Sequence, residues 1–341
     1  MKKMDQKFLD LSGYMFSGKA AASDLMREFE GFYLPNYRSE FDLIRMPGGL
    51  ADLKRSFGEW SVVGVDDAVR RFDLVVKKMA LSPKGIDKLF RTGFGYEKKY
   101  PGILAYTENF LASITDKSWS ISWPYSMLTL TPMEIFMIKV KAILTNASPW
   151  PEVEYRLCSG DNFVDAAKLY VESVLTSGAS DNFHTVIIHN ALEPFDPKRG
   201  FAFFNDIKSI VIDRDVRDIY MTGITHSDGF NDNVKLYSKI LGSFDIDIFI
   251  QRQELLRRNT DYSECKNILR LRFEDLVCDY DGTLKKIVEF LDIDPLSHTN
   301  KFRYFDPKKS VKNVGLWKLA SKEVARNVNK IEKMLPKLCY Q

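Results

Sequence analysis

The sequence has few of the features that mark secreted, metal-binding or membrane proteins. Its four cysteines show neither a C-x-x-C pair nor another metal-ligand spacing. Reduced thiols explain them most simply, so we expect a cytoplasmic protein without a bound metal. No signal-peptide-like apolar segment, internal repeat or low-complexity linker is visible. The most apolar window, residues 133–144, contains two lysines and is too short to span a membrane.

The remaining composition is that of an ordinary globular protein. Hydrophobic residues make up 45% and charged residues 28% of the 341 positions, enough for one large domain or two. The net charge of +3 is unevenly spread, because residues 301–341 contain 11 Lys or Arg against three Asp or Glu. This basic segment suits an anionic ligand, although a solvated helix face would show the same pattern.

Strand and helix patterns alternate along the chain. Short apolar runs predict four buried strands, at residues 7–12, 184–190, 209–213 and 267–273. Helical patterns follow them, which predicts a three-layer α/β fold with a parallel sheet flanked by helices. Residues 66–177 read mainly as helix. We therefore expect a single domain over residues 1–341, with a mainly helical insertion that caps the ligand edge of the sheet.

The turn after the first strand has the spacing of a phosphate-binding P-loop. Gly13, Gly18 and Lys19 form the pattern G-x-x-x-x-G-K, between a strand and a helix expected at residues 18–30. Backbone N–H groups in such a loop hold anionic oxygens, helped by the positive end of the helix. Ala20, however, stands where a nucleotide-hydrolysing loop needs Ser or Thr to bind magnesium. The loop therefore predicts a phosphate site without an obvious metal.

A second cluster of polar residues follows the strand at residues 209–213. Arg214 comes directly after this strand, at the edge of an α/β sheet where ligands bind. An arginine there can bind a phosphate through its two-pronged guanidinium group. Thr222 lies two turns into the next helix and can point toward the same anion. The alternative is an ordinary helix start with alternating surface ion pairs.

Five segments in this order resemble the sulfotransferases that use 3′-phosphoadenosine-5′-phosphosulfate (PAPS): SGYMFSGKAAASDL, VIIHNALEP, IVIDRDVRDIYMT, LRFEDLVCDYDGTLKKIVEFLDID and SVKNVGLWK. The fourth is similar to the family's LRYEDL…PxxTLxxIxxFLGL segment. The resemblance covers about half of the chain and has no counterpart in residues 66–177. It implies an enzyme that moves a sulfuryl group from PAPS to an acceptor hydroxyl or amine, by metal-independent in-line displacement.

The resemblance also implies roles for individual residues. The residues placed around the 5′-phosphosulfate of PAPS are Gly13, Ser17, Gly18, Lys19, Ala20 and Ala21. Arg214 and Thr222 match the residues that hold its 3′-phosphate. Lys312 lies in a segment that ends in Gly-x-Trp and matches the loop that closes over that phosphate.

The loop departs from the family pattern at the position of the catalytic lysine. The family places a lysine before the Ser-Gly pair and threonines after it, whereas here Phe16 precedes the pair and Lys19 follows it. We expect Lys19 to stabilise charge on the leaving oxygen. Two residues are candidate bases: His189, where cytosolic members place a histidine, and Glu40, where carbohydrate-acting members place a glutamate. A core histidine and a surface carboxylate are the plainer interpretations, and Asp42 is a weaker candidate.

Two other functions fit parts of the pattern. A P-loop phosphotransferase or nucleotide hydrolase explains Lys19 but not Ala20. A non-catalytic nucleotide-binding relative explains the missing threonines. For the leading interpretation, family habit alone suggests a glycan or glycolipid acceptor. We expect no nucleic-acid partner and no membrane span, and the oligomeric state stays open.

Overall fold

The computed structural model describes residues 7–35, 39–89, 91–179, 183–225 and 236–340. The chain divides into two compact units. The sheet unit comprises Met1–Met46, Lys99–Pro101 and Val171–Gln341, and the inserted unit comprises Pro47–Lys98 and Gly102–Tyr170. The insertion therefore begins and ends earlier than the expected residues 66–177. Each unit is described by itself.

The sheet unit is built on five parallel strands in the order β2-β5-β1-β6-β7. Their bounds are β1 (Lys7–Gly13), β2 (Phe32–Tyr33), β5 (Thr185–His189), β6 (Asp206–Asp213) and β7 (Ile268–Arg272). This confirms the predicted α/β fold with a parallel sheet. The four expected strands are present, with β6 starting three residues earlier than predicted, at Asp206. The two-residue edge strand β2 was not expected.

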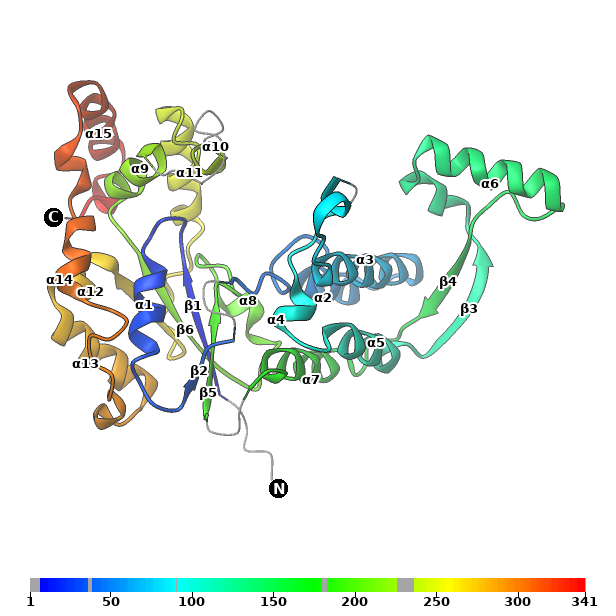
Figure 1. Cartoon of the computed structure of the whole chain (residues 1–341), viewed down its shortest axis with the longest axis horizontal. Helices are drawn as coiled ribbons and strands as arrows, with labels where there is room; N and C mark the ends of the chain where they lie inside the picture. The colour runs from blue at the N-terminus through cyan, green and yellow to red at the C-terminus, as the bar shows by residue number, and fades with distance from the viewer. Residues whose placement is uncertain (1–6, 36–38, 90, 180–182, 226–235, 341) are drawn as a thin grey trace. The chain divides into compact units, whose positions relative to one another are not determined.

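Helices flank this sheet (Figure 1). The α-helices of the sheet unit are α1 (Lys19–Met26), α8 (Lys198–Phe201), α9 (Val216–Thr225), α10 (Leu236–Leu241), α11 (Ile246–Arg258), α12 (Phe273–Cys278), α13 (Tyr280–Leu291), α14 (Pro307–Ser310) and α15 (Lys322–Met334). The 3-10 turns are η4 (Pro295–Ser297), η5 (Val311–Asn313), η6 (Leu316–Leu319) and η7 (Pro336–Leu338). Helix α7 (Phe163–Thr176) begins in the inserted unit and ends in the sheet unit.

Two apolar cores hold the sheet unit together. In the first, side chains of β1, β6 and β7 pack against α1, α12 and α13, which cover one face of the sheet. In the second, α9, α10, α11 and α15 pack together next to the end of β6. Helix α15 joins this core because Val328 and Ile331 lie on one face of it, as the sequence predicts, and the Ser321 side chain caps its first turn. These two cores position the segments that follow β1 and β6.

Helix α1 ends at Met26, four residues before the predicted end at Glu30. The chain tightens after Met26, where the N–H groups of Glu28 and Phe29 bond to the carbonyl oxygens three residues earlier. The Glu28 side chain is fully buried, and the backbone N–H groups of Phe302, Tyr304 and Phe305 donate to its carboxylate. These contacts fix Glu28 in place and favour a turn over continued helix.

The inserted unit combines helices with a two-stranded antiparallel ribbon. Its helices are α2 (Leu50–Gly58), α3 (Val62–Ala80), α4 (Tyr96–Lys99), α5 (Ile103–Ile114) and α6 (Pro132–Thr145), with 3-10 turns η1 (Gly85–Leu89) and η2 (Pro124–Thr129). The ribbon pairs β3 (Lys117–Ser122) with β4 (Glu152–Leu157), which the sequence did not predict. Within the described part of the chain, no helix combines the length and the apolar character needed to cross a membrane.

Candidate functional site

The loop between β1 and α1 is a strained turn that leaves a helix N-terminus open. Phe16 and Gly18 both adopt left-handed backbone conformations, with φ of 61° and 88°. A Cβ at Gly18 would lie 2.4 Å from the Phe273 ring, so the position requires glycine for both space and conformation. Gly18 is the N-cap of α1 and has no side chain to cap the helix. The first N–H groups of α1 are therefore available to an anion.

This loop lines a cavity of about 840 Å³, which we call the loop cavity. The volume lies within the range typical of small-molecule sites. Its walls come from segments that are far apart in the sequence: residues 14–24, 214–225, 273 and 302–316. The sequence-predicted residues at its wall are Ser17, Gly18, Lys19, Ala20, Ala21, Arg214 and Thr222.

Arg214 ties three of these segments together. Its side chain is buried, and Nη1 donates to the Phe16 carbonyl oxygen at 3.0 Å and to Thr222 Oγ1 at 3.3 Å. Nη2 donates to the carbonyl oxygen of Asn313. Its Nε is buried and has no hydrogen-bond partner among the described residues. The structure thus brings Arg214 and Thr222 together, and leaves one guanidinium donor without a protein acceptor.

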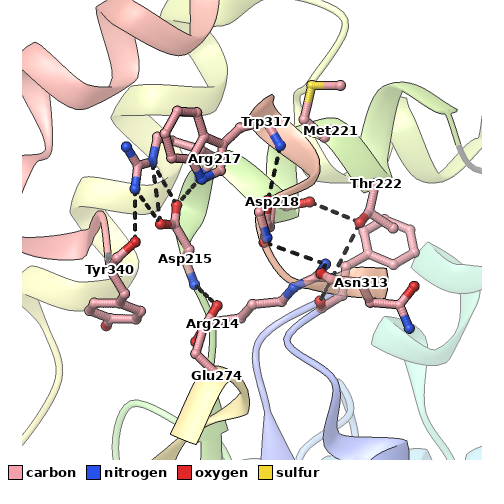
Figure 2. A network of polar contacts seen from close by, with 12 residues as sticks. Arg214, Asp215, Arg217, Asp218, Met221, Thr222, Glu274, Asn313, Trp317 and Tyr340 are labelled. Carbon is pink, nitrogen blue, oxygen red and sulfur yellow. Dashed lines mark hydrogen bonds and ion pairs between the residues drawn. The ribbon is translucent and has the colours of Figure 1, made fainter. Parts of the chain in front are cut away.

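Asp218 fixes the C-terminal segment to α9 (Figure 2). Its Oδ2 accepts from the Gly315 N–H at 2.7 Å, and its Oδ1 accepts from the Trp317 N–H at 3.1 Å. The guanidinium group of Arg217, the residue before Asp218, lies 4.0 Å from the Trp317 ring centre. Oδ2 of Asp218 also lies 3.9 Å from Nη2 of Arg214. The segment around Gly315 is therefore held beside Arg214 at the cavity wall.

Glu274 supports the start of α9 from the neighbouring strand end. Its Oε1 accepts from the Asp215 N–H at 2.9 Å. Burial raises the pKa of the Glu274 carboxyl to about 7, and its Oε2 has no hydrogen-bond partner in the described part of the chain. Glu274 does not line the loop cavity, and its contacts position α9.

Lys19 forms an ion pair with Glu40. The Lys19 Nζ lies 2.7 Å from Glu40 Oε1, and Glu40 Oε2 accepts from Arg45 at 2.8 Å and from Asn190 Nδ2 at 3.1 Å. Burial alone would raise the pKa of the Glu40 carboxyl, but Lys19, Asn190 and Arg45 together hold it below its ordinary value. Glu40 is therefore ionised at neutral pH while Lys19 stays beside it.

A second cavity of about 500 Å³ lies on the Glu40 side of Lys19, and we call it the Glu40 cavity. Its wall includes Glu40, Arg45 and Asn190. Lys19 lines both this cavity and the loop cavity. The two cavities therefore meet at Lys19, which can contact a ligand on either side.

His189 occupies a different environment from Glu40. It ends β5 and is only 6% exposed, and its Nε2 is buried without a partner among the described residues. Burial and the nearby charge of Lys19 lower the pKa of His189 to about 4, so the ring is neutral at pH 7. His189 lines neither cavity, whereas Glu40 does. Asp42 binds Arg45 at 2.7 Å and also lines neither cavity.

Two of the residues predicted to bind a donor lie away from the loop cavity. Gly13 lines the Glu40 cavity, and a Cβ there would lie 2.4 Å from Ser17 Oγ. Lys312 is exposed and is not part of the loop cavity wall, where Arg303 and Lys309 provide the cations instead. The basic C-terminal segment therefore supplies charge to this cavity, but from other residues than the one predicted.

Several residues that build the site were missed by the sequence reasoning. Glu28 holds the cavity-lining segment at residues 302–305, and Asn190 positions Glu40. Arg252, on α11, lines the Glu40 cavity. Asn190 had one usable signal, because an Asn directly after a buried strand tolerates the left-handed backbone that it adopts here, with φ of 51°. Glu28 and Arg252 look like ordinary helix-surface residues in the sequence.

The described residues contain no group of three or more His, Cys, Asp or Glu side chains arranged to hold a metal ion.

Comparisons with known proteins find a similarity to sulfotransferases in one part of the chain. Residues 189–335 match the family model described as "Sulfotransferase domain". Similar solved structures include the sulfotransferase domain from the Synechococcus PCC 7002 olefin synthase (10% identity, 99% of this chain and 95% of that chain, TM-score 0.40). Another is the sulfotransferase domain from the curacin biosynthetic pathway (10% identity, 98% of this chain and 99% of that chain, TM-score 0.35). A third is retinol dehydratase in complex with androsterone and inactive cofactor PAP (11% identity, 96% of this chain and 79% of that chain, TM-score 0.34). A search of curated proteins finds no match. The similarity to the sulfotransferase family thus rests on residues 189–335, which include Arg214, Thr222 and Lys312.

Proposed function

We propose that the chain transfers a sulfuryl group from PAPS to an acceptor hydroxyl or amine, with PAPS in the loop cavity and the acceptor in the Glu40 cavity. The observation that carries this proposal is the position of Lys19. It lines both cavities and contacts Glu40, a carboxylate that can take a proton, at 2.7 Å. The sulfotransferase domain match supports the reaction class.

The loop cavity has unused hydrogen-bond donors that fit a phosphate-rich ligand. Ser17 Oγ and Arg214 Nε are buried and have no partner among the described residues. The N-terminus of α1 has no side-chain cap. Buried donors of this kind are costly unless a ligand satisfies them. We assign Ser17 and the N-terminus of α1 to the 5′-phosphosulfate, and Arg214 with Thr222 to the 3′-phosphate.

When bound, PAPS supplies the sulfuryl group for an in-line displacement. Lys19 neutralises the negative charge that grows on the leaving oxygen. As Lys19 moves toward that oxygen, its charge no longer holds down the pKa of Glu40, and Glu40 becomes a better base for the acceptor proton. Arg45 and Asn190 keep the Glu40 carboxylate oriented. We favour Glu40 over His189 as the base because Glu40 lines the acceptor cavity.

A glycan or glycolipid remains our proposed acceptor. Tyr14, Phe195 and Tyr237 line the Glu40 cavity, and aromatic rings of this kind pack against sugar rings. The alternatives are phosphoryl transfer and simple nucleotide binding.

Calorimetric titration with 3′-phosphoadenosine-5′-phosphate (PAP) and with ATP–magnesium, each with and without a chelator, separates these functions. We expect chelator-insensitive binding of PAP and no binding of ATP. Binding of ATP that the chelator abolishes, in place of PAP binding, would overturn the proposal in favour of phosphoryl transfer. Binding of PAP without any sulfuryl transfer from PAPS to a glycan panel would favour the non-catalytic relative.

Two variants test the assigned roles. Lys19→Ala should lower kcat by roughly 100- to 1,000-fold, as removal of one donor to a developing negative charge does, with little change in PAP affinity. Arg214→Ala should mainly weaken PAP binding. Lys285→Ala, which removes an exposed lysine on α13, is the matched control and should change neither quantity. Near-normal turnover in Lys19→Ala would contradict its assignment.

A further inference from the structure

The Glu40 cavity contains one positive charge that no described residue balances. Its charged side chains are Lys19, Arg45 and Arg252 on one hand, and Glu40 and Glu193 on the other. Lys19 and Arg45 both contact Glu40, at 2.7 Å and 2.8 Å. Burial raises the pKa of the Glu193 carboxyl, and the positive charge of Arg45 opposes that rise. Arg252 forms no hydrogen bond or ion pair with any described residue. It is thus the cation of this cavity without a protein counter-charge in the described part of the chain.

The surroundings of Arg252 disfavour a positive charge. Arg252 lies on α11 and is half-buried, and burial together with the charge of Arg257 lowers the pKa of its guanidinium group. Arg257 itself is engaged, because it donates to Asp213 and to Gln253, each at 2.6 Å. Arginine stays ionised in proteins even in such places. The fold therefore keeps a cation where burial and a like charge both oppose it, which is typical of a ligand-binding position.

The size of the cavity places Arg252 close to the reacting groups. A compact cavity of about 500 Å³ is roughly 10 Å across, within the range of ligand sites. Arg252 and Lys19 both line it, and a cavity of this width has space for about one acceptor ring between opposite walls. Tyr14, Phe195 and Tyr237 line the same space and provide flat apolar surface for that ring.

We propose that Arg252 binds an anionic group of the acceptor, so that the acceptor class is a hydroxyl-bearing ring with a carboxylate, sulfate or phosphate about one ring away from the sulfated hydroxyl. The guanidinium group suits such anions because its N–H groups match their oxygens in pairs. The inference rests on the proposed function, since it assigns the Glu40 cavity to the acceptor. It makes Arg252 a specificity-determining residue.

Matched probe pairs that differ in charge test the proposal. The aromatic pair is 4-hydroxyphenylacetate and 4-hydroxyphenylacetamide, and the sugar pair is glucuronate and glucuronamide. Each probe is titrated by calorimetry into the full chain, with and without saturating PAP. We expect the anion of at least one pair to bind at least 10-fold more tightly than its amide. The pair that shows this preference indicates whether the anion belongs to an aromatic ring or a sugar.

Two variants make the assignment specific. Arg252→Gln should abolish the preference for the anion while leaving the affinity for the amide near wild type. Arg258→Gln removes an exposed arginine of the same helix that does not line this cavity, and it should keep the preference. Equal affinities within both pairs, no binding of any probe at millimolar concentration, or a preference that survives in Arg252→Gln would each overturn the proposal. The titrations without PAP measure probe binding separately from PAP binding. Failure of PAP to bind would therefore count against the proposed function, and not against the role of Arg252.

Discussion

Replacing Glu28 with Gln should loosen the wall that residues 302–305 provide to the loop cavity. In the structure, four donors converge on the two oxygens of the fully buried Glu28 carboxylate. Oε1 accepts from the N–H groups of Tyr304 and Phe305, both at 2.8 Å. Oε2 accepts from the Phe302 N–H at 3.1 Å and lies 2.9 Å from His298 Nε2. Because the site is closed to water, a lost acceptor is not replaced.

The size of the effect follows from these contacts. In Glu28→Gln, the new side-chain amide retains one oxygen, which can serve Tyr304 and Phe305, while its NH₂ group faces the other two donors. The His298 ring can accept from that NH₂ group in one tautomer, but the buried Phe302 N–H loses its acceptor, which costs about 1–3 kcal/mol. The remaining bonds also lose their ionic character, worth about 1 kcal/mol. We therefore expect a loss of about 2–4 kcal/mol from a total stability of about 5–15 kcal/mol.

Urea unfolding followed by circular dichroism measures this loss, and calorimetry with PAP measures the effect on the cavity. Glu28→Gln should unfold at a lower urea concentration and bind PAP about 10-fold more weakly, a change of about 1.4 kcal/mol in binding free energy. Glu30→Gln is the control, because Glu30 is exposed and only two residues away, and it should stay within about 0.5 kcal/mol of wild type. If Glu28→Gln unfolds at the wild-type midpoint, the carboxylate does not hold this segment as described.

Three further variants probe other parts of the site. Asp218→Asn removes one of two acceptors for the N–H groups of Gly315 and Trp317, and calorimetry should show weaker PAP binding by roughly 3- to 10-fold. Gly18→Ala should cost at least about 2 kcal/mol, seen as a lower Tm, because φ is 88° there and the new Cβ would meet a ring. His189 has its pKa lowered from 6.5 to about 4, so the unfolded chain binds the proton first as the pH falls. Its stabilising contribution, about 3 kcal/mol, is complete above pH 6.5 and lost between pH 6.5 and pH 4. Urea unfolding of wild type and His189→Gln across this range should show that difference; a constant difference would contradict the assignment.

The parallel sheet was predictable because most of its strands contain short runs of buried apolar residues, such as those in β1, β5 and β6. A run such as residues 184–190 has to be buried on both faces, and the helices between such runs then impose a parallel order. The ribbon of β3 and β4 was not predictable in this way. Its strands do alternate apolar and polar residues, with Trp119 and Ile121 in β3 and Val153, Tyr155 and Leu157 in β4. They are short, however, and lie in a stretch whose other patterns are helical, so the alternation was missed.

The candidate site was predictable where one residue type carries the chemistry by itself. The glycine spacing and Lys19 drew attention to the turn after β1, and the position of Arg214 drew attention to the end of β6; residues of both segments line the loop cavity. The partners that position these groups were not predictable, because they depend on contacts between distant segments. Glu28 and residues 302–305 lie more than 270 positions apart in the chain. In a sequence, a buried glutamate whose carboxylate binds four donors cannot be distinguished from an exposed glutamate.

The order of the cavity-lining segments along the chain has a consequence for synthesis on the ribosome. The loop after β1 lies near residue 18, whereas the cavity wall at residues 302–316 emerges from the ribosome almost 300 residues later. Arg214 cannot complete its contacts until Asn313 has left the exit tunnel. Until then, the loop after β1 is exposed on the nascent chain without the cavity walls that later segments provide. A ligand of this cavity can therefore stabilise the fold only after residues 302–316 have been made, and it cannot guide the earlier steps of folding.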